Sequence, residues 1–365
     1  MTTAQKLSFD VQLSDHARTA AEREAVLANP GFGQHFTDHM ISIDYTEALG
    51  WHNAQLMPYG PLSLDPATAV FHYAQELFEG LKAYRTSGDT IATFRPYANA
   101  ARFNKSCVRM AMPELPEEVF VEALELLVQT DKDWVPTTEG HSLYLRPFII
   151  ATQVGLGVNY PSRSYRFMVI ASPAASYFSG GIKPVSVWLS TDYTRAAPGG
   201  TGAAKCGGNY AAAFVATRQA VEEGCDQVVW LDSAEHRYVE EMGGMNLFFV
   251  YGDKLLTPAL TGTLLPGITR DSILTLAADL GLEAEEGRLS IEEWQAGCES
   301  GELTEVFACG TAAVVTPVGS VKGADRAWTV GDGTAGPVTM RVRDELVGIQ
   351  YGTRPDPHSW LHKIG

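Results

Sequence analysis

The sequence predicts an α+β protein in two domains. The chain has 365 residues, and a domain takes roughly 150 residues as a first expectation. Its composition, 45% hydrophobic and 19% charged, is typical of a globular protein. Strand-like and helix-like segments alternate along the chain, and Gly180, Gly181 and Pro184 interrupt this pattern. We therefore expect a first domain over 1–178, an interdomain linker over 179–192 and a second domain over 193–365.

The first domain contains five recognisable elements. "TIATFRP" (90–96) alternates as a short strand, and Pro96 suits the first position of the helix that follows. Apolar residues recur at helical spacing over 117–131, directly after Pro116, which predicts a second helix. The apolar runs at 141–150 and 165–172 predict buried strands.

The second domain continues the alternation. We expect strands at 185–191, 227–232 and 246–252, and helices near 209–223, 270–280 and 290–296. Ser290 and Glu293 have the spacing of a capping box, in which each side chain bonds to the backbone N–H of the other residue.

Charge and cysteine content exclude several classes of protein. The formal net charge of −16 opposes binding to a phosphate backbone, so we expect no nucleic-acid partner. The start "MTTAQKLSFD" has no apolar core like that of a signal peptide, and no apolar run is long enough to span a bilayer. The five cysteines include no C-x-x-C pair, which predicts reduced thiols and no metal site. A cytoplasmic protein without membrane contact is expected.

The segment "GGTGAAKCGGNYAAAFVATRQA" (199–220) surrounds Lys205 with glycine and alanine. A phosphate-binding loop needs Gly-Lys-Ser/Thr, whereas Lys205 follows Ala204 and precedes Cys206. A solvated lysine in a surface turn is one interpretation. The alternative is a desolvated lysine, whose amine is a nucleophile suited to Schiff-base formation. Small neighbours would leave room for a flat aromatic aldehyde.

An aldehyde of that kind, pyridoxal phosphate, needs further partners: an anion site, a carboxylate beside the ring nitrogen and a donor to the phenolic oxygen. "LLPGITRDSI" (264–273) offers a Pro-Gly turn that opens a helix, whose N–H groups suit a phosphate. Thr311 lies in the small-residue turn of "FACGTAAVV", and Glu241 precedes a Gly-Gly-Met-Asn turn. Taken singly, Gly267 could be a loop breaker, Thr311 a helix cap and Glu241 a solvated residue; together they favour the cofactor.

These segments resemble the branched-chain amino acid aminotransferases, a family of fold-type-IV pyridoxal phosphate enzymes. The resemblance implies an α+β fold like that of D-amino acid aminotransferase, with a small N-terminal α/β domain and a larger C-terminal domain with a β-barrel-like core. The matching motifs are "ELFEGLKAYR" (76–85), "FRPYANAARF" (94–103), "DKDWVP" (131–136), "SLYLRP" (142–147), "SYFSGG" (176–181), "KCGGNYA" (205–211), "EEMGGMNLF" (240–248), "LLPGITR" (264–270), "EVFACGTA" (305–312) and "IQYG" (349–352).

The resemblance also implies roles around pyridoxal 5'-phosphate. Lys205 would bind the cofactor covalently and act as the acid and base of catalysis. Glu241 would pair with the pyridinium nitrogen, and Tyr210 would bond the phenolic oxygen. The implied phosphate ligands are Arg102, the backbone N–H groups of Ile268 and Thr269, and Thr311.

The implied reaction is reversible transamination between L-leucine, L-isoleucine or L-valine and 2-oxoglutarate. It gives branched-chain 2-oxo acids and L-glutamate. Arg146 is the candidate partner for the glutamate side chain, with a structural salt bridge as the alternative. The residues that match the walls of the family's apolar pocket are Phe32, Tyr144, Tyr177 and Ala312.

The same resemblance predicts a homodimer. Leu156 and Val158 match a loop (154–160) that the family lends to the neighbouring active site. Small-molecule amino acids and 2-oxo acids are the other expected partners.

Two rival families of the same fold type, the D-amino acid aminotransferases and the aminodeoxychorismate lyases, would share Lys205 and Glu241. Both are usually shorter and lack "SLYLRP" and "DKDWVP". A nucleotide-binding protein would keep the phosphate turns but would need no nucleophile. The sequence also departs from the animal enzymes: Ala313 and Thr316 replace their cysteine pair, and Gly244 replaces a threonine near the cofactor.

Overall fold

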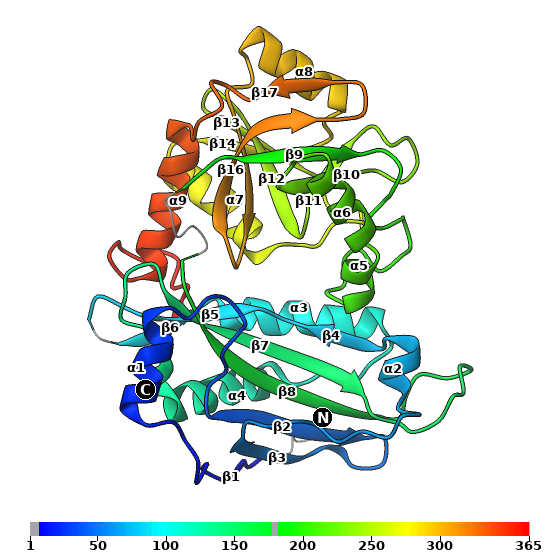
Figure 1. Ribbon diagram of the computed structural model, residues 1–365, viewed down its shortest axis with the longest axis vertical. Coiled ribbons are helices and arrows are strands. Elements are labelled where there is room, and N and C mark those ends of the chain that lie inside the picture. The colour runs from blue at the N-terminus through cyan, green and yellow to red at the C-terminus, as the bar shows by residue number, and fades with distance from the viewer. Residues whose placement is uncertain (1–6, 89, 177–181, 365) are drawn as a thin grey trace. The chain divides into compact units, whose positions relative to one another are not determined.

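The computed structural model describes residues 7–88, 90–176 and 182–364 (Figure 1). The chain forms two compact units, one comprising residues 1–176 and 350–365 and the other residues 177–349. The predicted second domain, 193–365, included the C-terminal end of the chain. This prediction is wrong, because residues 350–365 belong to the first unit. Strand β18 (Leu361–Ile364) pairs with β6 (Ile91–Phe94), because the edge of the first sheet has backbone groups to satisfy. With this segment included, the first unit has more residues than the second.

The first unit is built on one mostly antiparallel sheet. Its strand order is β1-β3-β2-β8-β7-β5-β6-β18, with β4 paired to β7. The bounds of its other strands are β1 (Asp10–Val11), β2 (His39–Thr46), β3 (Gly50–Pro58), β4 (Glu76–Phe78), β5 (Leu81–Arg85), β7 (Ser142–Ala151) and β8 (Ser164–Ala174). The helical elements of this unit are α1 (Ala20–Ala28), α2 (Ala69–Tyr73), α3 (Pro96–Arg109), α4 (Glu117–Thr130) and a 3-10 turn (Lys132–Trp134).

Helices α3 and α4 cover the sheet at the site of its aromatic core. Phe103 of α3, Phe120 of α4 and Phe167 of β8 lie with ring centres 5.4 to 5.7 Å apart. Such pairs combine a large buried apolar area with favourable ring geometry. Both helices, the two strands predicted at 141–150 and 165–172 and the strand at 90–96 are confirmed within a few residues.

The second unit contains a closed barrel of six strands, in the order β11-β10-β9-β16-β15-β12, with a β11–β12 pairing that completes the ring. Val187, Val229, Leu247, Phe249 and Val306 belong to the buried cluster in this unit. Closure leaves no open edge among these six strands, and the predicted barrel-like core is confirmed. The strands are β9 (Val185–Ser190), β10 (Gln227–Leu231), β11 (Val239–Met242), β12 (Met245–Tyr251), β15 (Glu305–Gly310) and β16 (Val314–Lys322), followed outside the ring by β13 (Lys254–Pro258), β14 (Glu283–Gly287) and β17 (Ala327–Thr329).

The predicted linker 179–192 is wrong over β9, since this strand is hydrogen-bonded on both sides within the barrel. The helix predicted at 209–223 is two helices, α5 (Gly207–Ala211) and α6 (Phe214–Glu222). They are separated where the Ala213 N–H bonds the Tyr210 carbonyl three residues back, which tightens the turn.

The remaining helices of the second unit are α7 (Ile268–Asp279), α8 (Ile291–Ser300) and α9 (Pro337–Gln350). The capping box of α8 is confirmed: the Glu293 N–H donates to Ser290 Oγ at 3.2 Å, and the Ser290 N–H donates to Glu293 Oε2 at 2.8 Å. Within the part of the chain that the structure describes, no helix is both long and apolar enough to cross a membrane.

Candidate active site

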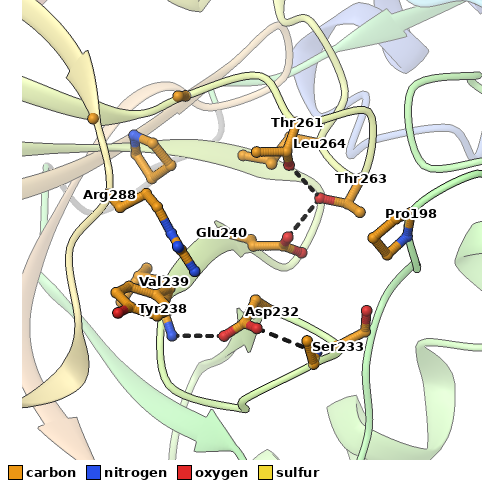
Figure 2. A pocket seen from close by; sticks show the side chains of 14 residues that line it. Pro198, Asp232, Ser233, Tyr238, Val239, Glu240, Thr261, Thr263, Leu264 and Arg288 are labelled. Atoms are coloured by element: carbon orange, nitrogen blue, oxygen red, sulfur yellow. Dashed lines mark hydrogen bonds between the residues drawn. The ribbon is translucent and has the colours of Figure 1, made fainter.

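A β-bulge places two consecutive glutamates at the end of the barrel. Val229 pairs with Met242 and Leu231 with Val239, so Glu240 and Glu241 together lie opposite Trp230. The Trp230 Nε1–H donates to the Gly243 carbonyl at 2.9 Å and holds the turn into β12. The two carboxylates then take different partners, and that of Glu240 accepts a hydrogen bond from Thr263 (Figure 2).

Glu241 is 1% exposed, and its carboxylate is bonded at both oxygens. Oε1 accepts the Leu265 N–H at 2.5 Å and the Asn246 amide at 3.3 Å, and Oε2 lies 3.2 Å from Arg195 Nε. Burial raises the pKa of Glu241, whereas the Arg195 charge, the Leu265 N–H and the Lys205 charge act in the opposite direction. Glu241 is therefore a buried carboxylate whose charge is supported by fixed donors.

Arg195 was missed by the sequence analysis. Its Nη1 donates to the Thr263 carbonyl at 2.7 Å and to the Gly202 carbonyl at 3.2 Å, in addition to the Glu241 pair. A buried carboxylate nearly always needs a cationic partner, so the prediction of a functional Glu241 could have prompted a search for one. Nothing in the local sequence "DYTRAAPGG" (192–200) identifies Arg195 among the other arginines.

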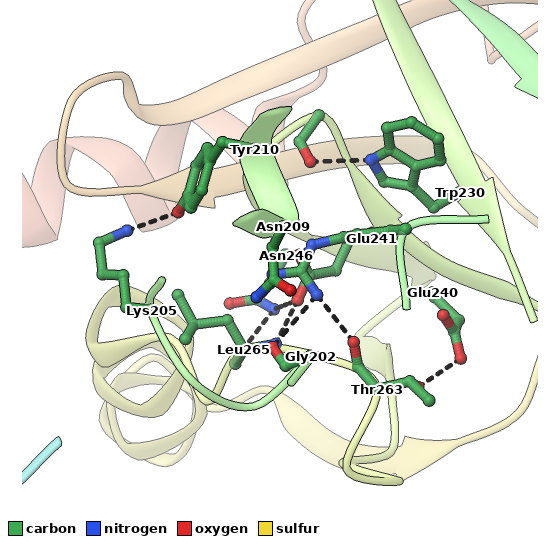
Figure 3. Close-up of polar contacts among 12 residues, drawn as sticks. Gly202, Lys205, Asn209, Tyr210, Trp230, Glu240, Glu241, Asn246, Thr263 and Leu265 are labelled. Carbon is green, nitrogen blue, oxygen red and sulfur yellow. Dashed lines mark hydrogen bonds and ion pairs between the residues drawn. The ribbon is translucent and has the colours of Figure 1, made fainter. Parts of the chain in front are cut away.

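Lys205 is half-buried, and its Nζ donates to the Tyr210 hydroxyl at 2.7 Å (Figure 3). Asn209 fixes the turn between them, because its amide donates to the Thr201 and Ala204 carbonyls at 2.9 Å each. A Cβ at Gly202 would overlap the Thr263 backbone. The small residue at 202 thus allows two backbone segments to pack closely. The sequence had suggested a different reason for small residues near Lys205, namely room for a cofactor.

The start of α7 and the turn after β15 both adjoin Asn246. A Cβ at Gly267, the N-cap of α7, would overlap the Asn246 side chain, and the register partner of Asn246 is Cys309, two residues before Thr311. Among the described residues, no side chain caps α7, so the N–H groups of Ile268 and Thr269 begin a helix that is suited to an anion. Ala312 follows Thr311 in the same turn.

In the first unit, three of the residues predicted for substrate, Phe32, Tyr144 and Arg146, form one cluster. The Phe32 and Tyr144 ring centres are 5.1 Å apart, and Arg146 Nη2 donates to the Tyr144 hydroxyl at 3.2 Å. The Arg146 guanidinium also lies 4.7 Å from the Phe78 ring centre. Among the described residues Arg146 forms no ion pair, and its buried Nε has no hydrogen-bond partner. The alternative of a structural salt bridge is therefore wrong.

Arg102, the predicted phosphate ligand from α3, is held by Glu79. Its Nε and Nη2 donate to the two Glu79 oxygens at 2.8 Å each. Asn99 donates a third bond to Glu79 at 2.8 Å. The guanidinium is thereby fixed in one orientation.

Leu156 and Val158 are exposed, at 62% and 69%, and Tyr73 anchors their loop through a bond to the Leu156 carbonyl. Tyr177 lies outside the described residues. The structure describes no cluster of side chains that could hold a metal ion within its residue ranges.

The amino-transferase class IV family model matches residues 76–321, which include most of the residues described above. The chain is also 60% identical over 363 residues to the branched-chain-amino-acid aminotransferase of Mycolicibacterium smegmatis, with 98% of each chain covered. This chain belongs to the branched-chain-amino-acid aminotransferases of class IV. A relative of the same name in Mycobacterium tuberculosis H37Rv is 57% identical over 368 residues, with both chains fully covered.

Solved structures agree with this family. The branched-chain amino acid aminotransferase of Escherichia coli matches with a TM-score of 0.76 at 30% identity, over 90% of this chain and 99% of that one. A T.th. branched-chain amino acid aminotransferase with pyridoxamine 5'-phosphate matches with a TM-score of 0.74 at 31% identity, over 88% of this chain and 98% of that one. The predicted family, fold type, class of reaction and pyridoxal phosphate cofactor are confirmed.

Proposed function

We propose that this branched-chain aminotransferase exchanges the amino group between L-leucine, L-isoleucine or L-valine and 2-oxoglutarate, with pyridoxal 5'-phosphate as cofactor. The observation that carries the proposal is the pairing of Lys205 with Tyr210 in the unit that also buries Glu241 against Arg195. An amine nucleophile and a buried carboxylate are the two groups that this cofactor needs most.

The residues of the second unit fit the cofactor. The Lys205 amine lies beside a hydroxyl, the α7 N-terminus is without a side-chain cap among the described residues, and Glu241 is a buried acceptor. When bound, pyridoxal phosphate supplies an aldehyde for the amine and a protonated ring that accepts electron density. We assign covalent attachment to Lys205 and the pyridinium contact to Glu241.

Lys205 is also the proton carrier of the proposed mechanism. Its amine would hold the cofactor and would carry the proton between the substrate α-carbon and the C4′ atom of the cofactor. The Tyr210 hydroxyl, 2.7 Å from Nζ, orients the amine and is the proposed donor to the phenolic oxygen. Lys205 is therefore proposed both to hold the cofactor and to transfer the proton.

Glu241 must stay ionised to keep the ring nitrogen protonated. Burial alone would favour the neutral acid, and Arg195 together with the Leu265 N–H counteracts it. Arg195 is thus a positioning residue that acts through Glu241. The proposed phosphate ligands are the N–H groups of Ile268 and Thr269, Thr311 and Arg102.

The proposed substrate contacts come from the aromatic cluster around Arg146. A guanidinium without an ion pair among the described residues suits the second carboxylate of glutamate, which leucine lacks. Phe32, Tyr144 and Ala312 would contact the aliphatic chain, and Tyr177 remains a prediction. Apolar contacts of this kind discriminate by only about 1–3 kcal/mol per methylene, so all three branched-chain amino acids would react.

We further propose a homodimer in which Leu156 and Val158 contact the neighbouring subunit. Their large exposed apolar side chains on one loop support an interface there. A cytoplasmic location is part of the proposal, since all five cysteines are unpaired thiols.

The test is Lys205→Ala, with Lys254→Ala as a matched control. Lys254 is an exposed lysine of the same unit, bonded to Glu285 at 2.8 Å. We expect Lys205→Ala to lose the visible absorbance band of the bound cofactor and about 10⁴-fold or more of transamination activity. Lys254→Ala should keep both. Turnover of leucine by Lys205→Ala at the rate of the control would overturn the assignment.

A further inference from the structure

The second unit contains a pocket that the proposed reaction does not use. It has a volume of about 260 Å³ and is lined by Asp232, Tyr238, Glu240, Thr263 and Arg288, among others. Figure 2 shows the Glu240 carboxylate amid the labelled side chains, with Arg288 reaching toward the same space. The pocket therefore presents groups of opposite charge.

Glu240 is the unsatisfied group of this pocket. The residue is 7% exposed, and its Oε1 accepts the Thr263 hydroxyl at 2.5 Å. Its buried Oε2 has no hydrogen-bond partner within the described ranges. A buried carboxylate oxygen without a donor costs free energy that a ligand with an N–H group would recover. Burial raises the pKa of Glu240 and Asp232 adds to that effect, so a cation beside it would be favoured in turn.

Asp232 does not compete for such a ligand. Its two oxygens accept four backbone N–H groups between residues 234 and 238, at 2.8 to 3.2 Å. These bonds lower the pKa of Asp232 to about 2, although burial opposes them. Asp232 thus shapes the wall of the pocket, and Glu240 is the carboxylate that can receive a donor.

Arg288 supplies the opposite charge at the exposed side. Its guanidinium carbon lies 3.5 Å from the centre of the Tyr238 ring, and its side chain is 58% exposed. The Glu235 carboxylate is at 3.7 Å, a loose contact for an exposed pair. A guanidinium stacked on a ring keeps its plane, and its N–H groups can then bind a carboxylate in a bidentate manner.

We propose that this pocket binds a small free amino acid, whose ammonium group donates to Glu240 Oε2 and whose carboxylate accepts from Arg288. A purely anionic ligand would be repelled by the Glu240 carboxylate and would donate no hydrogen bond to it. An apolar ligand would also leave Oε2 without a donor. Thr263 also accepts a bond from Arg195 through its carbonyl, at 2.7 Å. The pocket is therefore connected by hydrogen bonds to the Arg195–Glu241 pair.

The experiment is isothermal titration calorimetry on the full-length holoenzyme. The probes are glycine, β-alanine and 4-aminobutyrate, which place one to three methylenes between the charges, together with propionate and propylamine. The variants are Glu240→Gln and Arg288→Gln. Arg237→Gln is the control, because Arg237 is a nearby exposed arginine that pairs with Glu292 and does not line the pocket.

We expect at least one of the three amino acids to bind, and to bind at least 10-fold more weakly to both Glu240→Gln and Arg288→Gln than to Arg237→Gln. Propionate and propylamine should each bind at least 10-fold more weakly than that amino acid. The proposal is overturned if none of the three binds, if both variants bind it as the control does, or if propylamine binds equally well. Since Arg288 is exposed, its variant keeps the test valid even if Glu240→Gln fails to fold.

Discussion

Each unit holds a fully buried glutamate paired with an arginine, and the two pairs differ in geometry. In the first unit, Glu79 and Arg102 form two parallel bonds of 2.8 Å, and Asn99 adds another. In the second, Arg195 meets Glu241 through one contact of 3.2 Å, while backbone and amide donors bind the other oxygen. Bidentate pairing fixes a guanidinium rigidly, whereas a single contact leaves a carboxylate able to serve another cation.

The two pairs therefore have different effects. In the first pair the glutamate orients the arginine, and in the second pair the arginine lowers the pKa of the glutamate. In the proposed mechanism Arg102 of the first pair binds the cofactor phosphate. Glu241 of the second pair contacts the pyridinium nitrogen. Arg146 marks a third case, a guanidinium with no ion pair among the described residues. The same two residue types thus support three roles, which their geometry distinguishes.

Among variants of these arginines and glutamates, the largest effect is expected from Glu241→Gln. The neutral amide keeps the shape but cannot hold the ring nitrogen protonated, so kcat should fall by about 10²–10³-fold. Steady-state kinetics with L-leucine and 2-oxoglutarate measures it. Glu285→Gln is the control for kcat in saturating substrate, because Glu285 is a solvent-accessible glutamate of the same unit that pairs with Lys254. A fall of less than 3-fold in Glu241→Gln would remove Glu241 from the proposed mechanism.

Glu79→Gln should act on stability rather than on chemistry. It removes one charge of a buried, bidentate pair, and such losses cost about 3–5 kcal/mol. Urea unfolding of the variant measures this cost, with Glu47→Gln as the control, since Glu47 and Arg163 form an exposed pair. At saturating cofactor, kcat should change by less than about 3-fold. If Glu79→Gln lost as much kcat as Glu241→Gln, the proposed difference between the two glutamate–arginine pairs would be contradicted.

Arg195→Met is expected to move the pH profile. Burial raises the pKa of Glu241 and Arg195 lowers it, so removal of Arg195 raises that pKa further. The carboxylate then loses its charge at a higher pH as the solution is acidified, and the acid limb of kcat/KM shifts to higher pH. At neutral pH we expect about a 10-fold loss. Arg195→Lys, which keeps the cation, should shift the limb less; an unmoved limb in Arg195→Met contradicts the role.

The smallest effect is expected from Arg146→Met. The KM for 2-oxoglutarate should rise by about 10-fold, the value of one charged hydrogen bond, while the KM for L-leucine stays within 2-fold. Arg163→Met, an exposed arginine of the same unit, is the control. Equal increases for both substrates would show that Arg146 only supports the shape of the pocket.

The sequence was most informative where chemistry depends on local motifs. Lys205 and Tyr210 are five residues apart, so the family motif could assign both to one site, and the structure brings Lys205 Nζ to 2.7 Å from the Tyr210 hydroxyl. The α8 capping box and the Pro-Gly start of α7 are local for the same reason. Such signals depend on a few adjacent residues and on backbone geometry that those residues dictate.

Long-range features could not be read from the sequence. Arg195 meets Glu241 and the Thr263 carbonyl, which follow it by 46 and 68 residues, and only the barrel brings these segments together. The pairing of β18 with β6 likewise joins the chain end to a strand near residue 90. The break between α5 and α6 falls within an alanine-rich run whose intrinsic helix propensity is high, so tertiary context decided it.

The most direct test of the central claim is an absorbance spectrum of the purified holoprotein before and after addition of L-leucine without a 2-oxo acid. We predict a visible band from the cofactor on Lys205 that shifts to the near-ultraviolet as the amino group is transferred. A band that leucine leaves unchanged would contradict the substrate assignment. The absence of any band after addition of pyridoxal phosphate would contradict the role of Lys205.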